Sequence, residues 1–354
     1  MPGAGGGGGD QVVAFDALGA EGGAGVVVEG IGRAAADGIG VRVFGRPGEL
    51  TDLRALQGVE VIEAASVIPN RAEPVAAVRS TPDASIVLAA ADVAEGRSQG
   101  LVSAGSTGAA MTAALFALRR LSGVHRPALA VQVPVPSRDI PVVFLDVGAN
   151  SEARPQHLVQ FAYLGSAFAT VVLGIDRPRV GLLTIGEEQG KGIPLVVEAG
   201  AALDRADNLD FAGNVEGRDL PAGSVDVVVA DGFTGNVALK TMEGTASEVT
   251  GAVRSAARGN PVAALGGLLL RPALGGVRRR LDPDQTGGAI LLGLRGVAIV
   301  AHGSSSADGI ANAVRQAARA VDERIVERTG ELLEASRATR SSLRDDGERD
   351  TKTG

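Results

Sequence analysis

The sequence predicts an α/β fold with helices packed on a mostly parallel β-sheet, and three observations lead to this prediction. Residues 225–230 form a β-branched apolar run, which is typical of a strand buried on both faces. The run stops at Asp231-Gly232, after which Thr234 or Asn236 can cap a following helix. Aromatic residues make up only 3% of the chain, so Val, Leu, Ala and Ile must fill the core, which suits helices packed closely on a parallel sheet.

Similar strand–loop–helix units recur along the chain. In order, strands are expected at 12–15, 41–44, 60–63, 100–103, 128–133, 142–145, 180–185, 210–212, 225–230 and 297–300. Helices are expected at 24–37, 84–95, 110–121, 154–173, 195–207, 235–258 and 307–333, with one more that begins at 287–289. The strands are short apolar runs that stop at polar residues or glycine, and the helices have apolar residues at helical spacing. Strands 128–133 and 142–145 are adjacent and are expected to form a hairpin.

Chain length and composition limit the domain organisation. At 354 residues, the chain can form one large domain or two smaller ones. We expect a single large α/β catalytic domain over residues 11–334, between a disordered glycine-rich segment (1–10) and a disordered charged tail (335–354). Residues 260–281 are expected to protrude from this domain as a helical segment rich in apolar and basic residues.

Residue counts exclude several kinds of site. The chain has no cysteine, which excludes disulfides, iron–sulfur clusters, thiolate catalysis and cysteine-based zinc sites. The histidines are His125, His157 and His302, and they show no metal-ligand spacing. We therefore expect neither a metal site nor a cofactor.

Charge and hydropathy limit the partners. The net charge of −7 argues against general nucleic-acid binding, although a local basic patch is compatible with it. No charged segment followed by an apolar one opens the sequence, and no apolar run reaches membrane-spanning length. We expect a cytoplasmic protein that is at most peripheral to a membrane.

The loop after strand 100–103 has the composition of an anion site. Small residues here let backbone N–H groups approach an anion closely, with the positive end of the following helix behind them. The alternative is a tight helix start eased by glycine. The residues expected to hold phosphate are Gly105, Ser106, Thr107 and Gly108.

The loop 186–192 places a lysine among glycines. It imitates a phosphate-binding Walker loop but has glycine spacing one residue short, and Gly192 replaces the Ser or Thr that would hold magnesium. Nucleotide hydrolysis is therefore disfavoured. Lys191 is either a solvated surface lysine or a functional one. The chain has only three lysines beside many arginines, and this isolation favours a functional role.

Polar residues also follow the strand 225–230. Asp231, Thr234, Gly235 and Asn236 stand at its carboxyl end, where ligands of open α/β sheets bind. An ordinary turn between a strand and a helix uses the same residue types, so both interpretations stay open.

The segment 260–281 combines leucines with arginines. An apolar patch at 265–274 contains Arg271 and is followed by three arginines at 278–280. Apolar residues beside arginines are typical of an interfacial or partner-binding segment. A helical hairpin that packs on a neighbouring subunit is the equally weighted alternative.

Six motifs occur together in one order along the chain. They lie at 103–109, 146–150, 181–192, 213–219, 230–240 and 287–305, and the string DGFTGNV at 231–237 is the most distinctive. With these motifs, residues 12–328 resemble the bacterial fatty acid/phospholipid synthesis protein family PlsX, the acyl-[acyl-carrier-protein]:phosphate acyltransferases. The agreement of all six in register is a stronger signal than any single motif.

The resemblance implies an enzyme that moves a long acyl chain from the thioester of acyl-carrier protein to inorganic phosphate, giving acyl phosphate for phospholipid synthesis. It also implies a three-layer α/β/α sandwich, similar to the folds of phosphotransacetylases and isocitrate-dehydrogenase-type proteins. Members form homodimers, and some contact membranes peripherally, so we expect a homodimer that contacts anionic membrane. The resemblance assigns Lys191 and Asp231 to the active site, and we expect Asn150, Asn214 and His302, in the matching loops, to bind substrate or phosphate.

The chain departs from the family pattern in places. The first loop of the family usually has the sequence Asp-Ala-Met-Gly-Gly-Asp-His, whereas this chain has DALGAEG at 16–22. The histidine is absent, and Glu21 is longer than the usual aspartate. Ser106 stands where asparagine is usual, and the loop after His302 is slightly altered. If the missing histidine were an essential base, activity would be lost.

The residues suit this reaction on chemical grounds. Phosphate is itself a nucleophile, so the protein must supply a cradle for phosphate and donors for the thioester oxyanion. We expect the 103–109 loop to hold phosphate and Lys191 to neutralise it. Asn236, or backbone N–H groups near Gly235, are expected to stabilise the oxyanion, while Asp231 orients a donor.

Two alternatives stay open. The chain can be a phosphotransacetylase-like enzyme that uses acyl-coenzyme A, in which case it has less need of an apolar groove for a long chain. It can also be an inactive scaffold that tethers acyl-carrier protein to a membrane, which the altered first loop suggests.

Overall fold

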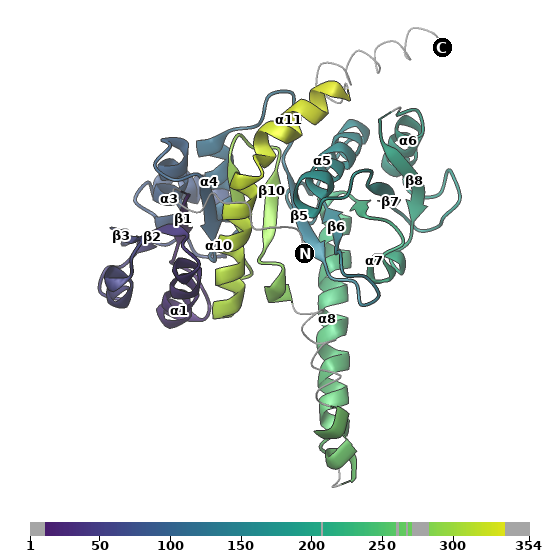
Figure 1. Cartoon of the computed structure of the whole chain (residues 1–354). Helices are drawn as coiled ribbons and strands as arrows, with labels where there is room; N and C mark the ends of the chain where they lie inside the picture. The colour runs from purple at the N-terminus through teal and green to yellow at the C-terminus, as the bar shows by residue number, and fades with distance from the viewer. Residues whose placement is uncertain (1–10, 207, 260–261, 267, 271–282, 337–354) are drawn as a thin grey trace.

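The computed structural model describes residues 11–336 except 207, 260–261, 267 and 271–282. In this part of the chain the strands form one sheet of 11 strands, with the order β3-β2-β1-β4-β11-β10-β5-β6-β9-β7-β8. Helices cover both faces (Figure 1). The predicted α/β/α sandwich with a mostly parallel sheet is therefore confirmed. The division into domains stays a prediction.

The sheet contains two parallel groups of strands. The first group consists of β3 (Val59–Glu63), β2 (Gly40–Gly45), β1 (Val12–Asp16), β4 (Gly100–Ser103) and β11 (Val297–Val300). The second group consists of β6 (Val142–Leu145), β9 (Val227–Val229), β7 (Arg179–Leu183) and β8 (Asp210–Val215).

Two strands join the groups. β10 (Ala289–Leu292) is antiparallel to β11 and to β5 (Ala128–Val133), and β5 is antiparallel to β6. Three reversals in a row leave the two parallel groups running in opposite directions. The carboxyl ends of the strands, where α/β proteins place ligands, therefore lie on opposite sides of the sheet in the two groups. The first edge is the carboxyl end of the first group, and the second edge is the carboxyl end of the second group.

Each face of the sheet carries its own core. One helical layer contains α1 (Gly23–Ala36), α5 (Pro155–Leu173), α6 (Pro194–Leu203), α10 (Ala307–Asp322) and α11 (Ile325–Ala335). The other contains α2 (Pro74–Ser80), α3 (Ser85–Ala94), α4 (Thr107–Leu118), α7 (Asp219–Ala222) and α8 (Gly232–Ala256). In β6, Val143 and Leu145 belong to the first core, while Val142 and Phe144 belong to the second. This alternation is what a strand buried on both faces requires.

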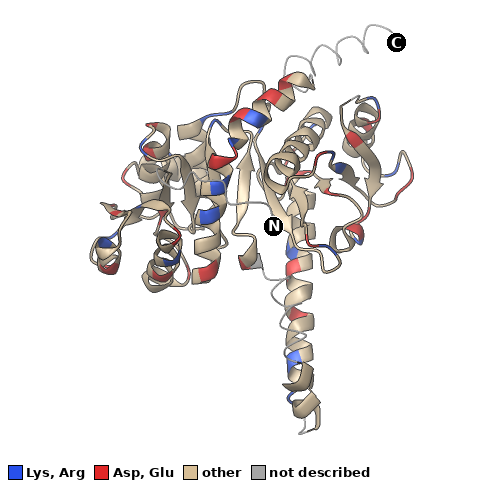
Figure 2. Ribbon diagram, in the orientation of Figure 1, with Lys and Arg blue, Asp and Glu red and all other residues tan. Residues whose placement is uncertain are grey.

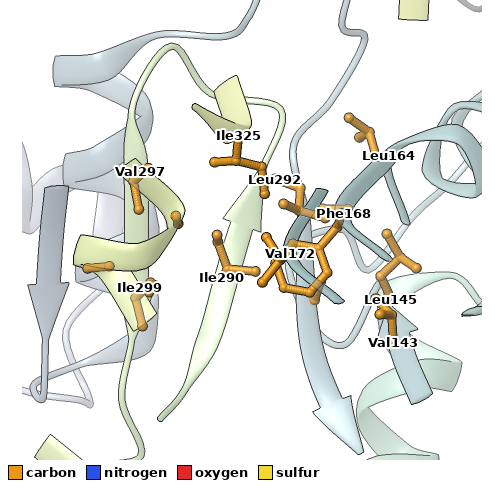
Figure 3. Packing of buried hydrophobic residues seen from close by; sticks show 14 of the residues in the cluster. Val143, Leu145, Leu164, Phe168, Val172, Ile290, Leu292, Val297, Ile299 and Ile325 are labelled. Atoms are coloured by element: carbon orange, nitrogen blue, oxygen red, sulfur yellow. The ribbon is translucent and has the colours of Figure 1, made fainter. Parts of the chain in front are cut away.

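The helix α5 lies in the centre of its layer. Its Leu164, Phe168 and Val172 lie beside Leu145 of β6 and Ile290 of β10 (Figure 3). Among the described residues, α5 is long and apolar enough to cross a membrane, which corrects the expectation that no run reaches that length. Its window is 72% buried within the protein, as expected of a core helix.

The segment that begins at 287 leads into the strand β10 at Ala289, so the predicted helix there is wrong. Gly287 and Gly288 have φ angles of 87° and 158°, and Ile290, Leu291 and Leu292 are all buried between β11 and β5. A short apolar run without a clear period is compatible with either element. Its place in the middle of the sheet comes from pairing with residues far away in the sequence.

Other boundaries also differ from expectation. The predicted last helix is two helices, because Arg324 adopts the left-handed conformation with φ 51° and turns the chain back onto α5. α2 and the short 3-10 helices at Thr51–Ala55 and Pro283–Gln285 were not among the elements predicted from the sequence. The predicted hairpin of β5 and β6 is confirmed, with Val131 opposite Phe144.

The helix α8 begins against the turn that follows β6. Asp231 is its N-cap and accepts hydrogen bonds from the N–H groups of Phe233 and Thr234 at 3.0 and 2.9 Å, so the expected cap at Thr234 or Asn236 is wrong. A Cβ atom at Gly235 would lie 1.9 Å from the carbonyl oxygen of Asp146. Glycine is thus required where α8 approaches this turn. Farther along, α8 extends beyond the rest of the molecule (Figure 1).

We predict that Gly235→Ala destabilises the protein by about 3 kcal/mol or more, because the new methyl group must displace backbone. Gly244→Ala in the same helix is the control, since a Cβ atom there meets nothing within 4 Å. Alanine at that position should stabilise the protein by about 0.5–1 kcal/mol. Urea denaturation of the two variants and the wild type measures both effects. Equal stability of the two variants would contradict the close approach at Gly235.

Candidate active site

A buried carboxyl group lies at the carboxyl edge of the first strand group. Asp16 ends β1 and is only 2% exposed. It accepts hydrogen bonds from the hydroxyl groups of Ser85 and Ser103, the latter at 2.7 Å, and from the N–H of Leu18 at 3.4 Å. These contacts join β1, β4 and the start of α3 at one point.

The predicted phosphate loop lies directly beside Asp16. The hydroxyl oxygen of Ser103 accepts a hydrogen bond from the N–H of Gly105 at 3.1 Å. A Cβ atom at Gly105 would come within 2.8 Å of the carbonyl oxygen of Leu18, so the glycine permits this approach. Ser106 then caps α4 by accepting from the N–H of Ala109 at 3.5 Å. The first N–H groups of a helix have no acceptor within the helix, so this end of α4 can bind an anion.

Packing also favours glycine at position 108. A Cβ atom at Gly108 would lie 2.8 Å from the side chain of Pro74, the first residue of α2. A larger residue at this position would disturb the contact between α2 and α4. The site role of Gly108 stays a prediction.

The loop after β11 joins the same edge. The N–H of Glu21 donates to the carbonyl oxygen of Gly303 at 2.9 Å, which ties this loop to the one after β1. The Nδ1 atom of His302 lies 2.7 Å from the hydroxyl of Ser304. Its Nε2 atom lies 3.5 Å from the Nζ atom of Lys240 on α8. Lys240 is also paired with Glu243 at 2.8 Å.

A second set of loops lies at the opposite edge. Asp146 follows β6, and its carboxylate accepts from the N–H groups of Ala149 at 2.9 Å and Asn150 at 2.8 Å. The side-chain amide of Asn150 donates to the carbonyl oxygen of Pro127 at 2.8 Å and to Asp146. Burial raises the pKa of the Asp146 carboxyl. Both side chains hold the turn on which α8 begins.

The predicted lysine loop lies at this second edge. The side chain of Asn214 in β8 donates to the carbonyl oxygen of Glu188 at 2.8 Å, and Thr184 donates to that of Lys191 at 3.2 Å. Lys191 itself is exposed. Asn236 is exposed on α8 near Gly148, whose Cβ position would lie 3.9 Å from the side-chain carbon Cγ of Asn236.

The structure therefore divides the predicted site residues into two groups. Gly105, Ser106, Thr107, Gly108 and His302 lie at the edge of the first strand group. Asn150, Lys191, Asn214, Asp231, Gly235 and Asn236 lie at the edge of the second. The 103–109 loop and the loop of Lys191 follow strands of opposite direction. The expectation that Lys191 neutralises a phosphate held by the 103–109 loop stays a prediction.

The helix α8 connects the two edges. Its N-cap Asp231 lies at the second edge, and its third turn carries Lys240 to His302 at the first. Asn236 and Lys240 are four residues apart and so share a face of the helix.

Asp16 and Lys240 are not among the site residues predicted from the sequence. The signals were present but weak: Asp16 ends a strand, and Lys240 is one of only three lysines. Their neighbours Ser85 and His302 are 69 and 62 residues away in the sequence, so only the folded chain shows the contacts.

Comparisons with known proteins agree on the family. The model of a family described as fatty acid synthesis protein matches residues 11–328. The chain is 49% identical over 274 residues to a phosphate acyltransferase of Elusimicrobium minutum, covering 77% of this chain and 80% of the relative. It is 45% identical over 321 residues to a phosphate acyltransferase of Heliobacterium modesticaldum, covering 89% and 95%.

Solved structures show the same fold at lower identity. A phosphotransacetylase from Streptococcus pyogenes superimposes with a TM-score of 0.57 and 18% identity, covering 88% of this chain and 94% of that one. A branched-chain phosphotransacylase from Enterococcus faecalis also gives 0.57, at 16% identity, covering 88% and 99%. The similarity to phosphotransacetylase folds expected from the sequence is confirmed.

Burial also shifts the pKa values of Asp16 and His157. Burial raises the pKa of Asp16 from 3.8 to about 6, and the hydrogen bonds from Ser85, Ser103 and Leu18 offset only part of this effect. Burial also lowers the pKa of His157 in α5 to about 4, and the neighbouring positive charges of His125, Arg126 and Arg154 act in the same direction. In both cases the uncharged form is favoured in the folded protein.

We predict that Asp16 makes the unfolding free energy fall as the pH rises from about 4 to about 6. In this window the folded protein keeps the Asp16 proton and the unfolded chain loses it, which costs on the order of 3 kcal/mol in total. His157 acts oppositely, because there the unfolded chain binds the extra proton. The measurement is therefore a difference: urea denaturation of wild type and Asp16→Asn from pH 4 to 6.5. The wild type should lose stability relative to the variant as the pH rises, and a pH-independent difference would contradict the prediction.

Proposed function

The chain belongs to the fatty acid synthesis protein family, the family of the phosphate acyltransferases, and on that premise we propose that it transfers a long-chain acyl group from acyl-carrier protein to inorganic phosphate. The product is acyl phosphate for phospholipid synthesis. The observation that carries the proposal is the site at the first edge. It consists of the 103–107 loop at the start of α4, His302 and Lys240, and the Nζ atom of Lys240 lies 3.5 Å from the Nε2 atom of His302.

The chemistry of this edge suits an inorganic anion. The start of α4 offers backbone N–H groups and the positive end of a helix dipole. Lys240 supplies a positive charge, and His302 supplies a ring nitrogen 3.5 Å from it. We propose that groups from these three elements together hold phosphate, which would limit its orientation and favour attack along one direction.

Acyl transfer then needs one bond to form and one to break. A phosphate oxygen bonds to the thioester carbonyl carbon, and the carbon–sulfur bond breaks, which gives acyl phosphate and a thiol after the thiolate takes a proton. We propose that the amide of Asn236 donates to the carbonyl oxygen as negative charge develops on it. Asn236 shares a face of α8 with Lys240, so both can reach one substrate.

The residues at the second edge are proposed to place α8 and to receive the acyl donor. The side chain of Asp231 accepts hydrogen bonds from the N–H groups of Phe233 and Thr234. Asp231 therefore sets where α8 begins and thereby where Asn236 lies. Lys191, Asn150, Asn214 and Gly235 are proposed to support the acyl donor rather than phosphate. Lys191 is exposed and cationic, which suits an acidic carrier protein.

A direct comparison of two substrates identifies the acyl donor. The wild type is offered palmitoyl-acyl-carrier protein or acetyl-coenzyme A, each with inorganic phosphate, and acyl phosphate is measured. Preference for the palmitoyl carrier protein supports the proposal. Preference for acetyl-coenzyme A supports a phosphotransacetylase-like enzyme, which the shared fold favours as the second candidate. No product from either donor supports the inactive scaffold.

We also propose a cytoplasmic homodimer that contacts anionic membrane through the end of α8 and the helical residues beyond it. Val249 and Val253 of α8 are 57% and 53% exposed, and Leu265 and Leu269 are 59% and 73% exposed. Few charged residues lie along the protruding helix (Figure 2). The predicted basic cluster at 271 and 278–280 lies outside the described residues. Sedimentation with and without anionic vesicles tests both the dimer and the membrane contact. A monomer that does not sediment with the vesicles would refute both.

We predict that Lys240→Gln raises the KM for phosphate by roughly tenfold or more, because a charge-assisted contact is lost. Lys191→Gln should lower the rate while leaving the KM for phosphate within about threefold of wild type. Steady-state assays with varied phosphate at saturating donor measure both values. Lys240→Arg, which keeps the charge, should recover part of the loss. The reverse pattern would place phosphate at the second edge.

A further inference from the structure

The buried Asp16 carboxyl has no role in the proposed transfer, yet it lies next to the loop that binds phosphate. We propose that Asp16 is a positioning residue: through Ser103 it holds the 103–107 loop in the shape that presents the start of α4 to phosphate. The identity of the anion rests on the proposed function. The contacts from which the positioning role is inferred are independent of the proposed function.

Strand pairing places the two side chains together. β1 and β4 are parallel neighbours, and Asp16 stands opposite Ser103 in their register. The Ser103 hydroxyl donates to one carboxylate oxygen of Asp16 at 2.7 Å, while Ser85 at the start of α3 donates to the other. The carboxyl group is therefore held from two sides, and Ser103 has one preferred orientation.

The same hydroxyl group sets the first residues of the loop. Because its hydrogen is directed at Asp16, its oxygen is free to accept the N–H of Gly105, which lies 3.1 Å away. The loop after β1 closes over this contact: a Cβ atom at Gly19 would lie 3.1 Å from the Cα atom of Gly105. The chain thus leaves β4 along a defined path and enters α4 at Ser106.

A second buried aspartate shows what a purely structural carboxyl group looks like here. Asp92 is 1% exposed, and Arg42 and Arg97 pair with it at 3.1 and 2.7 Å. Among the described residues, no Lys or Arg pairs with Asp16 in this way. In the described part of the chain, Asp146 is also buried without a paired Lys or Arg, but backbone N–H groups of its own turn donate to it. Asp16 depends instead on hydroxyl groups from other elements, one of which, Ser103, begins the 103–107 loop, so the retention of this costly buried acid fits a role in the site.

The experiment compares Asp16→Asn with Asp92→Asn in the full chain. For Asp16→Asn we expect the KM for phosphate to rise about tenfold or more, with the KM for the acyl donor within about twofold of wild type. For Asp92→Asn we expect lower stability and neither KM changed. Equal rises in both KM values for Asp16→Asn, or an unchanged KM for phosphate in a folded variant, would overturn the inference.

A second variant and a direct binding measurement complete the test. Ser103→Ala removes the link and keeps the carboxyl, so it should also raise the KM for phosphate; it decides the matter if Asp16→Asn does not fold. Titration calorimetry with inorganic phosphate separates this inference from the proposed function. If the wild type makes no acyl phosphate but binds phosphate more tightly than Ser103→Ala does, the function fails and the positioning role stands. If the wild type is active and both bind phosphate equally, the positioning role fails.

Discussion

The antiparallel hairpin of β5 and β6 decides where the functional loops of this protein lie. β10 is antiparallel to both β11 and β5, so its two reversals cancel and β11 and β5 run in the same direction. The hairpin adds one further reversal, and the two parallel groups therefore run in opposite directions. Loops that resemble one another in composition therefore follow carboxyl ends at opposite edges of the sheet.

The helix α8 overcomes part of this separation. A helix that follows a strand runs back along the sheet, so α8 starts at the second edge and reaches the first within about three turns, at a rise of about 1.5 Å per residue. Its start is held by the Asp231 cap and by the approach of Gly235 to Asp146. Its third turn brings Lys240 to His302. One helix thus couples a rigid turn at one edge to a cationic contact at the other.

The sequence was informative about elements and motifs. The run 225–230 ends at Asp231 as expected, and the loop 103–107 does lead from a buried strand into a helix. Family motifs identified the reaction class, because chemistry depends on residue types in short loops. Predictions failed where a short segment had no clear period. The apolar run at 289–292 is a strand only because Ala289 and Ile290 pair with Val300 and Ile299, and Ile290 and its neighbours pair with β5.

By itself, the sequence determined most of the segments that form strands and helices, which loops carry polar and glycine residues, and the family to which the chain belongs. These are local properties, set by hydrophobic period and turn chemistry. Tertiary structure alone decided which loops meet. Asp16 contacts Ser85 and Ser103 across 69 and 87 residues, and Lys240 contacts His302 across 62. Contacts between such distant residues depend on strand order and direction, which follow from how the whole chain buries its apolar faces and not from any segment alone.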